Sequence, residues 1–241
     1  MLALAGMLTV MAVGAGAVSV YLPVKAKQVS KTVYDGDTTT NKTVTTYKNT
    51  VLDGLRVRVA EYSSYDGAKK HLKNDGIYTY NQKGIAVSYY KTVHYGYDLT
   101  DSQNAYMGGP MTIKLDQYGR YTENTNQNGT ETYSYKDKLS GKKLKSYTQI
   151  TDNGDGKTVY AYYTSGSAKG QLKTVTSYTK IGKTFKKTYV SKYTYTMDQN
   201  KNVKTCVQKD VSYSYNSKGK VEDTSTQTSK ITYQYKKYTL K

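Results

Sequence analysis

Pairs of tyrosines separated by one residue recur along this chain, and they constrain its fold more than any other feature. They are Tyr133/Tyr135, Tyr193/Tyr195, Tyr213/Tyr215 and Tyr233/Tyr235, and the last three pairs begin 20 residues apart. Side chains alternate between the two faces of a strand, so both rings of each pair lie on one face. Because 20 is even, the spacing predicts that successive pairs keep the same phase, as in a series of similar hairpins.

Alternation with a period of two is clearest toward the C-terminus. From Val203 to Tyr215 the odd positions carry mostly Val and Tyr, whereas the even positions carry Lys, Cys, Gln, Asp and Ser. This pattern predicts a strand whose odd positions are covered. The odd positions of residues 189–197 and 231–235 continue the same phase, and Lys and Thr fill the opposite face.

Short polar turns separate these runs, and several of them end in glycine. The predicted turns include Asn81–Gly84, Asp116–Gly119, Asn126–Gly129, Asn153–Gly156, Lys180–Gly182 and Asn216–Gly219. Asn and Gly supply the positive backbone angles that tight hairpins require. The predicted fold is therefore all-β: an elongated antiparallel meander of repeated β-hairpins, either a single sheet or a curled, partly closed one.

The domain organisation follows from the same patterns. We expect one elongated β-repeat domain over residues 27–241, most regular over residues 111–238. One short helix is predicted near residues 64–74, where Ser64 is a suitable cap for its start and Gly76 lies just past its end.

An uncharged apolar run extends from Met1 to Val20, and residues 1–26 predict a signal peptide, with cleavage after Ala26 and a second candidate site at Ala15-Gly16-Ala17. An uncleaved membrane anchor and a buried structural segment are the alternatives. Cys206 is the only cysteine, so no intramolecular disulfide can form. Together these features predict a secreted or cell-envelope protein of a bacterium, with a Gram-positive source as the expectation.

Tyrosine decides whether such a chain can build a core. Val, Leu and Ile are scarce and the net charge is +18, a combination typical of disordered chains. The chain nevertheless has 29 tyrosines, against one Phe and no Trp. A tyrosine buries roughly 150–250 Å², so a thin core built largely of phenol rings is expected.

Three segments resemble the tyrosine-rich YD (RHS-type) repeats of exported bacterial proteins. They run from Tyr213 to Val221, from Tyr78 to Ile85 and from Leu115 to Tyr121. The stretch Tyr162–Gly166, with Gln171-Leu172-Lys173, is also similar to the MORN-like repeats of YwqK-type proteins. The resemblance implies strand meanders, sometimes curled into shells, in an exported protein. It transfers no catalytic residues.

No set of residues in the sequence predicts a catalytic, cofactor or metal site. His71, His94 and Cys206 are isolated, and the thiol is expected on the polar face of its strand. Residues 152–156 resemble part of a calcium loop but lack the glutamate required at the twelfth position, and Asp35-Gly36-Asp37 is likewise interpreted as a hairpin turn. We therefore expect a protein that is not an enzyme and holds no cofactor or metal.

The excess of lysine is the remaining lead to a partner. Only Arg56, Arg58 and Arg120 are arginines, which argues against sequence-specific nucleic-acid recognition. Lysines spread among Tyr and Thr favour salt-sensitive attraction to an anionic cell-wall or surface polymer, such as teichoic acid, anionic lipid or glycosaminoglycan. The simpler interpretation is that they keep a long sheet soluble and protect its edges. Another surface protein is a second possible partner, and membrane contact is expected only through an uncleaved N-terminal segment.

The sequence thus predicts an exported cell-envelope or secreted β-repeat protein that binds anionic surface polymers. One alternative is a carbohydrate- or cell-wall-binding repeat module, although the chain has no Trp. A toxin-immunity or effector partner protein is a further alternative, suggested by the YwqK-like stretch.

Overall fold

The computed structural model describes residues 11–13, 17–95, 106–118, 120–126, 129–141, 143–150, 154–216 and 218–241. All regular structure in these residues is β-strand. The strands are β1 (Met11–Val13), β2 (Ala17–Tyr34), β3 (Asp37–Leu52), β4 (Arg56–Tyr65), β5 (His71–Tyr80), β6 (Ala86–Tyr95), β7 (Tyr106–Leu115), β8 (Tyr121–Asn126), β9 (Gly129–Thr132), β10 (Lys136–Ser140), β11 (Lys143–Ile150), β12 (Gly156–Tyr162), β13 (Leu172–Ile181), β14 (Thr184–Met197), β15 (Val203–Tyr215) and β16 (Val221–Leu240). The predicted all-β antiparallel meander is confirmed.

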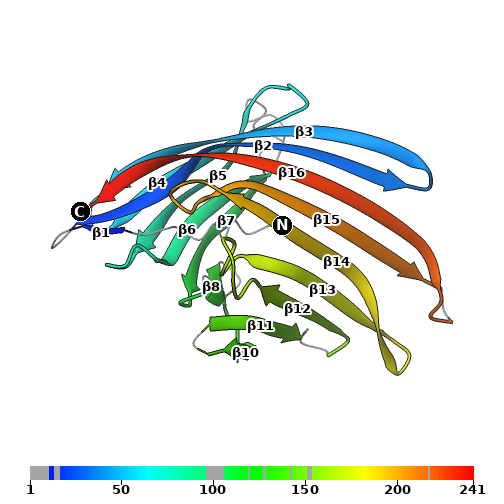
Figure 1. Cartoon of the computed structure of the whole chain (residues 1–241). Coiled ribbons are helices and arrows are strands. Elements are labelled where there is room, and N and C mark those ends of the chain that lie inside the picture. The colour runs from blue at the N-terminus through cyan, green and yellow to red at the C-terminus, as the bar shows by residue number, and fades with distance from the viewer. Residues whose placement is uncertain are drawn as a thin grey trace.

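The strands form one antiparallel sheet in which nearly every strand pairs with its neighbours in sequence (Figure 1). The exception is the C-terminal strand β16, which pairs with β2 near the N-terminus over a long register, from Thr226↔Val33 to Leu240↔Val18. This pairing places β16, β2 and β3 at the middle of the sheet. Its two edges are β9 and β10, which follow one another in the chain but do not pair.

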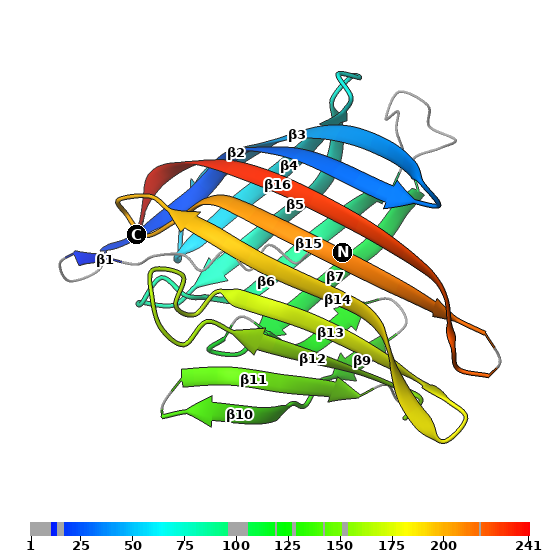
Figure 2. The same cartoon turned by 45° about the vertical axis from the view of Figure 1, so that its right-hand side comes forward.

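The sheet curls so that its two ends lie beneath the arch formed by β16, β2 and β3 (Figures 1 and 2). We call the concave face of the curled sheet the inner face, and the convex face the outer face. Cross-strand partners share a face, so the registers assign each residue to one of the two. Tyr78 and Tyr89 are directly opposed on the inner face, as are Tyr147 and Tyr160.

Two clusters of buried side chains form the core. The first contains Val18, Val20, Leu22, Val57, Tyr80 and Leu240. The second contains Ala26, Tyr193, Val203, Cys206 and Ile231, with further tyrosines packed against it. The predicted dependence on tyrosine is therefore correct in the second cluster, whereas aliphatic side chains dominate the first.

Tyrosine rings contact one another from strand to strand along the inner face. Tyr78 stacks on Tyr89 with 5.1 Å between ring centroids, and Tyr147 stacks on Tyr160 with 4.5 Å. Tyr193 and Tyr195 lie on the same face of β14 with nearly parallel rings, as a Tyr-x-Tyr pair in a strand requires. Burial raises the pKa of Tyr78 and of Tyr193 to about 12.

One turn geometry recurs four times between strands. The first residue is Asn81, Asp116, Asp198 or Asn216, and its side-chain oxygen accepts hydrogen bonds from the backbone N–H groups two and four residues later. Such a side chain satisfies backbone donors that the ladder leaves unpaired. Three of these turns are predicted from the sequence; the fourth, after Asp198, has Lys201 at φ 63 in place of a glycine.

The predicted phase of β15 is wrong. Cys206, Gln208 and Asp210 are buried, so its even positions face inward. Tyr213 lies opposite Thr224 on the outer face, unlike Tyr193 and Tyr233. The reason is the register of the two hairpins that contain β15. In both of them an odd-numbered residue lies opposite an even-numbered one, as in Tyr193↔Gln208 and Cys206↔Ile231. The inward positions therefore change from odd on β14 to even on β15 and back to odd on β16. The polar inward side chains are satisfied locally, since the Gln208 amide donates to both oxygens of Asp210 at 3.0 and 2.9 Å.

The predicted helix near residues 64–74 is also wrong. Ser64 lies within β4, which ends at Tyr65. Asp66 and Gly67 form a turn with φ of 46 and 84, and β5 begins at His71. The apolar positions of this segment are too few for a helical stripe, and pairing with β4 satisfies its backbone instead.

The N-terminal segment contributes β1, which pairs with the start of β2, and the first half of β2 itself, which begins at Ala17. Val18 and Val20 are 2% and 0% exposed and belong to the first core cluster. The cleavage prediction after Ala26 remains a prediction, but such a cut would remove the first ten residues of β2.

Candidate functional site

Six exposed lysines gather on the outer face of the five central strands. They are Lys192 on β14, Lys209 on β15, Lys230 on β16, Lys27 and Lys31 on β2, and Lys42 on β3. We call this set the outer lysine face. The registers connect its members: Lys230 and Lys42 both lie opposite Val29, and Lys31 lies opposite Thr228, which in turn opposes Lys209. Because neighbouring strands lie about 4.8 Å apart, these charges stand about 5–10 Å from their nearest neighbours.

Acidic residues are absent from the same positions. In the paired registers from β14 to β3, the other outward positions carry Thr, Val, Leu, Gln, Tyr and Lys, and none carries Asp or Glu. The ion pairs found in the described part of the chain involve Arg58, Lys114 and Arg120, all outside this face. The outer lysine face therefore presents a single sign of charge, which raises the local concentration of anions.

Lys192 and Lys209 are direct cross-strand partners. Like charges directly opposite one another on a sheet are destabilising. Their position also argues against protection of an edge, because β14 and β15 lie well inside the sheet rather than at β9 or β10. An anion bound between the two ammonium groups would relieve this repulsion.

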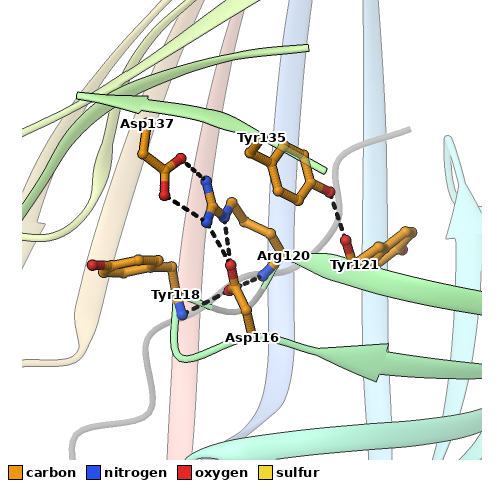
Figure 3. Close-up of polar contacts among 6 residues, drawn as sticks. All are labelled: Asp116, Tyr118, Arg120, Tyr121, Tyr135 and Asp137. Carbon is orange, nitrogen blue, oxygen red and sulfur yellow. Dashed lines mark hydrogen bonds and ion pairs between the residues drawn. The ribbon is translucent and has the colours of Figure 1, made fainter. Parts of the chain in front are cut away.

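A second charged cluster surrounds Arg120, between the two ends of the sheet (Figure 3). Its guanidinium lies 2.6 Å from carboxylate oxygens of both Asp116 and Asp137, and only 8% of the side chain is exposed. The Arg120 guanidinium also lies over the rings of Tyr135 and Tyr147, at 4.3 and 4.7 Å from the ring centres. All of its donors face partners already present, so this cluster is a structural clasp and offers little to a ligand.

The two histidines lie on adjacent strands of the sheet, β5 and β6. His71 is the first residue of β5 and pairs with Ser63, and His94 lies in β6, where its side chain is outside the described residues. Among described residues, no three His, Cys, Asp or Glu side chains come together as a metal site would require.

Cys206 lies on the buried inner face, not on the polar face that the sequence predicts. It is 4% exposed and packs in the second core cluster. Burial raises the pKa of the Cys206 thiol to about 11, so the reactive thiolate is scarce at neutral pH.

The acidic turns behave as the sequence suggests where they can be described. Asp35 and Gly36 have positive φ and join β2 to β3 as a two-residue hairpin turn. Asp152 and Asn153 lie outside the described residues, and Asp155 is an exposed residue just before β12.

Comparisons with known proteins identify no family. No family model and no curated protein matches the chain. Similar solved structures include a porin-like protein from Bacteroides uniformis, with 15% identity, TM-score 0.27, and coverage of 89% of this chain and 98% of that one. An outer membrane lipoprotein-sorting protein domain from Vibrio parahaemolyticus shows 9% identity and TM-score 0.34, covering 93% of this chain and 86% of that one. A protein of unknown function from Nostoc punctiforme shows 10% identity and TM-score 0.17, covering 87% and 95%.

These likenesses are too weak to carry an argument about function or cellular location. The predicted resemblance to YD and MORN-like repeats and the expected Gram-positive source gain no support from them. No helix in the described residues has the length and apolar character needed to cross a membrane.

Sequence reasoning found the excess of lysine but missed its arrangement. The opposition of Lys192 and Lys209 depends on the register between β14 and β15, to which no local motif points. The one available signal was the run of Lys and Thr at alternate positions in these strands.

Proposed function

We propose that this protein is exported to the cell envelope or beyond and binds an anionic surface polymer through the outer lysine face. The polymer is a linear chain bearing phosphate or sulfate groups. The observation that carries the proposal is the direct opposition of Lys192 and Lys209 within a face free of acidic residues.

Geometry supports a long ligand rather than a single small anion. The six lysines span five adjacent strands and line neither of the two best-formed pockets of the described residues, so each can contact a different unit of a polymer. Lysine is a point charge without the planar fork of arginine, which suits attraction to repeated anions without strict recognition of their shape. Such binding is expected to be strongly dependent on salt.

Equilibrium binding to soluble polyphosphate and to heparin tests the proposal and separates phosphate from sulfate ligands. We expect the double variant Lys192→Thr/Lys209→Thr to bind at least tenfold more weakly at low salt. Lys69→Thr/Lys70→Thr is the matched control, because it removes the same charge from two exposed residues in the β4–β5 turn. An equal loss of affinity in both variants would show that binding depends only on the net charge of the protein. That result would contradict a site on the outer lysine face.

A further inference from the structure

A groove on the inner side of the sheet offers a second binding surface, distinct from the outer lysine face. Its lining residues come from the turn between β14 and β15, from the C-terminal half of β16 and from β2. Figure 2 shows these three elements close together. The groove holds about 480 Å³. This volume falls within the range of about 300–1,000 Å³ typical of small-ligand sites.

Two tyrosines provide an aromatic wall for the groove. Tyr233 and Tyr235 are half-buried on β16, with 6.0 Å between ring centroids and planes tilted by 36°. Tyr233 packs against the second core cluster, so its ring is held before any ligand arrives. Fixed rings reduce the entropy lost on binding and present an apolar surface to the C–H face of a sugar ring.

A rigid turn supplies polar groups opposite these rings. The Asp198 carboxylate accepts hydrogen bonds from the backbone N–H groups of Asn200 and Asn202, both at 2.8 Å, and from the Asn202 amide. Three hydrogen bonds from its own turn therefore hold this carboxylate in place. The Tyr21 hydroxyl donates to Asn200 Oδ1 at 3.3 Å, which orients the Asn200 amide and leaves its N–H donors for a ligand.

The charge of the groove selects among possible sugars. Lys204 is exposed and lines the groove, and it takes part in none of the ion pairs found among the described residues. The Asp198 carboxylate keeps its negative charge, but it accepts three hydrogen bonds from its own turn, so Lys204 is the charged lining residue whose donors remain for a ligand. An ammonium group beside aromatic rings and amides matches a pyranose ring that carries a carboxylate.

We infer that this groove binds an acidic sugar residue of the uronic-acid type. The ring packs on Tyr233 and Tyr235, hydroxyl groups accept from the Asn200 amide, and the carboxylate pairs with Lys204. The inference does not rest on the proposed function, since the groove and the outer lysine face lie on opposite faces of the sheet.

Binding of a galacturonic-acid trisaccharide, compared with a neutral glucose trisaccharide, tests the inference. The chain has no Trp, so tyrosine fluorescence can report the titration directly. We expect the acidic trisaccharide to bind about tenfold more tightly than the neutral one, and Lys204→Gln to abolish this preference. That difference corresponds to about 1.4 kcal/mol, the size expected for one charged hydrogen bond.

Lys209→Gln is the matched control, because it makes the same change on the same strand but on the outer face. It should leave trisaccharide binding unchanged and weaken polyphosphate binding, whereas Lys204→Gln should do the reverse. Failure of the wild-type chain to bind the acidic trisaccharide, or equal affinity for both sugars, would overturn the inference. Neither result would affect the proposal for the outer lysine face.

Discussion

Arg120 and Asp137 join the two ends of a single sheet. Arg120 lies at the start of β8, near one edge, and Asp137 belongs to β10, the opposite edge strand. The Arg120 guanidinium donates to both Asp137 oxygens, at 2.6 and 3.1 Å, while its remaining contacts go to Asp116 (Figure 3). This pair links the start of β8 to the edge strand β10, and these two strands share no ladder.

Replacing Arg120 with methionine should therefore destabilise the fold strongly. The change keeps much of the side-chain length but leaves two carboxylates near one another without a cation. Breaking a buried pair in this way costs about 3–5 kcal/mol. Urea unfolding measures the loss, and Arg58→Met is the control, since Arg58 pairs with Asp75 at an exposed site and should contribute far less to stability. Similar effects of the two variants would rule out a special role for the clasp.

Alkaline pH should unfold the protein through its buried tyrosines. Burial raises the pKa of Tyr78 and Tyr193 to about 12, against about 10 in an unfolded chain. Between these values the unfolded state has lost the proton and the folded state keeps it, so stability is fully present below pH 10 and falls as pH rises. Each such tyrosine should lower the free energy of unfolding by about 1.4 kcal/mol per pH unit.

Urea unfolding at several pH values, with phenolate absorbance recorded in parallel, measures this slope. Tyr193→Phe should reduce the slope of the free energy of unfolding against pH by about 1.4 kcal/mol per pH unit, the contribution of one buried tyrosine. A free energy of unfolding that stays constant from pH 10 to 12 would contradict the burial of these rings.

Cys206 should be inert in the folded protein. The thiol is 4% exposed and burial raises its pKa to about 11, so both access and ionisation are limited. We expect a thiol reagent to label the chain at least a hundredfold more slowly under native conditions than in denaturant. Rapid labelling of the native protein would place Cys206 on the polar face instead.

The segment before Ala26 should contribute to stability. Val18, Val20 and Leu22 are at most 3% exposed, and each buried aliphatic side chain is worth about 1.5–3 kcal/mol. A chain beginning at residue 27 should accordingly be less stable than one beginning at residue 17, by several kcal/mol of the roughly 5–15 available to a domain. Thermal unfolding of the two chains compares them directly. Equal midpoints would show that β2 needs only its second half.

Local patterns in the sequence predicted the local parts of this fold. The turns after Asn81, Asp116 and Asn216 follow from side-chain chemistry within five residues, and the strand character of residues 203–215 follows from alternation. The phase of Tyr213 could not be predicted in this way, because it depends on whether paired residue numbers sum to an odd or an even value. A repeat length of 20 does not determine that sum.

The same limit applies to the candidate site. The excess of lysine is evident from composition, but the opposition of Lys192 and Lys209 is a property of the register between two strands. The groove beside Tyr233 brings Tyr21 to Asn200, which are 179 residues apart in the chain. Only the long-range pairing of β16 with β2 makes that contact possible.

The salt dependence of polyphosphate binding tests the central claim most directly. Each lysine that neutralises a phosphate contributes about 0.7–0.9 to the slope of log binding constant against log salt concentration. The slope of Lys192→Thr/Lys209→Thr should therefore be smaller than that of the wild type by about 1.5, while Lys69→Thr/Lys70→Thr should keep the wild-type slope. Identical slopes for all three proteins would contradict the assignment of the outer lysine face as the binding site.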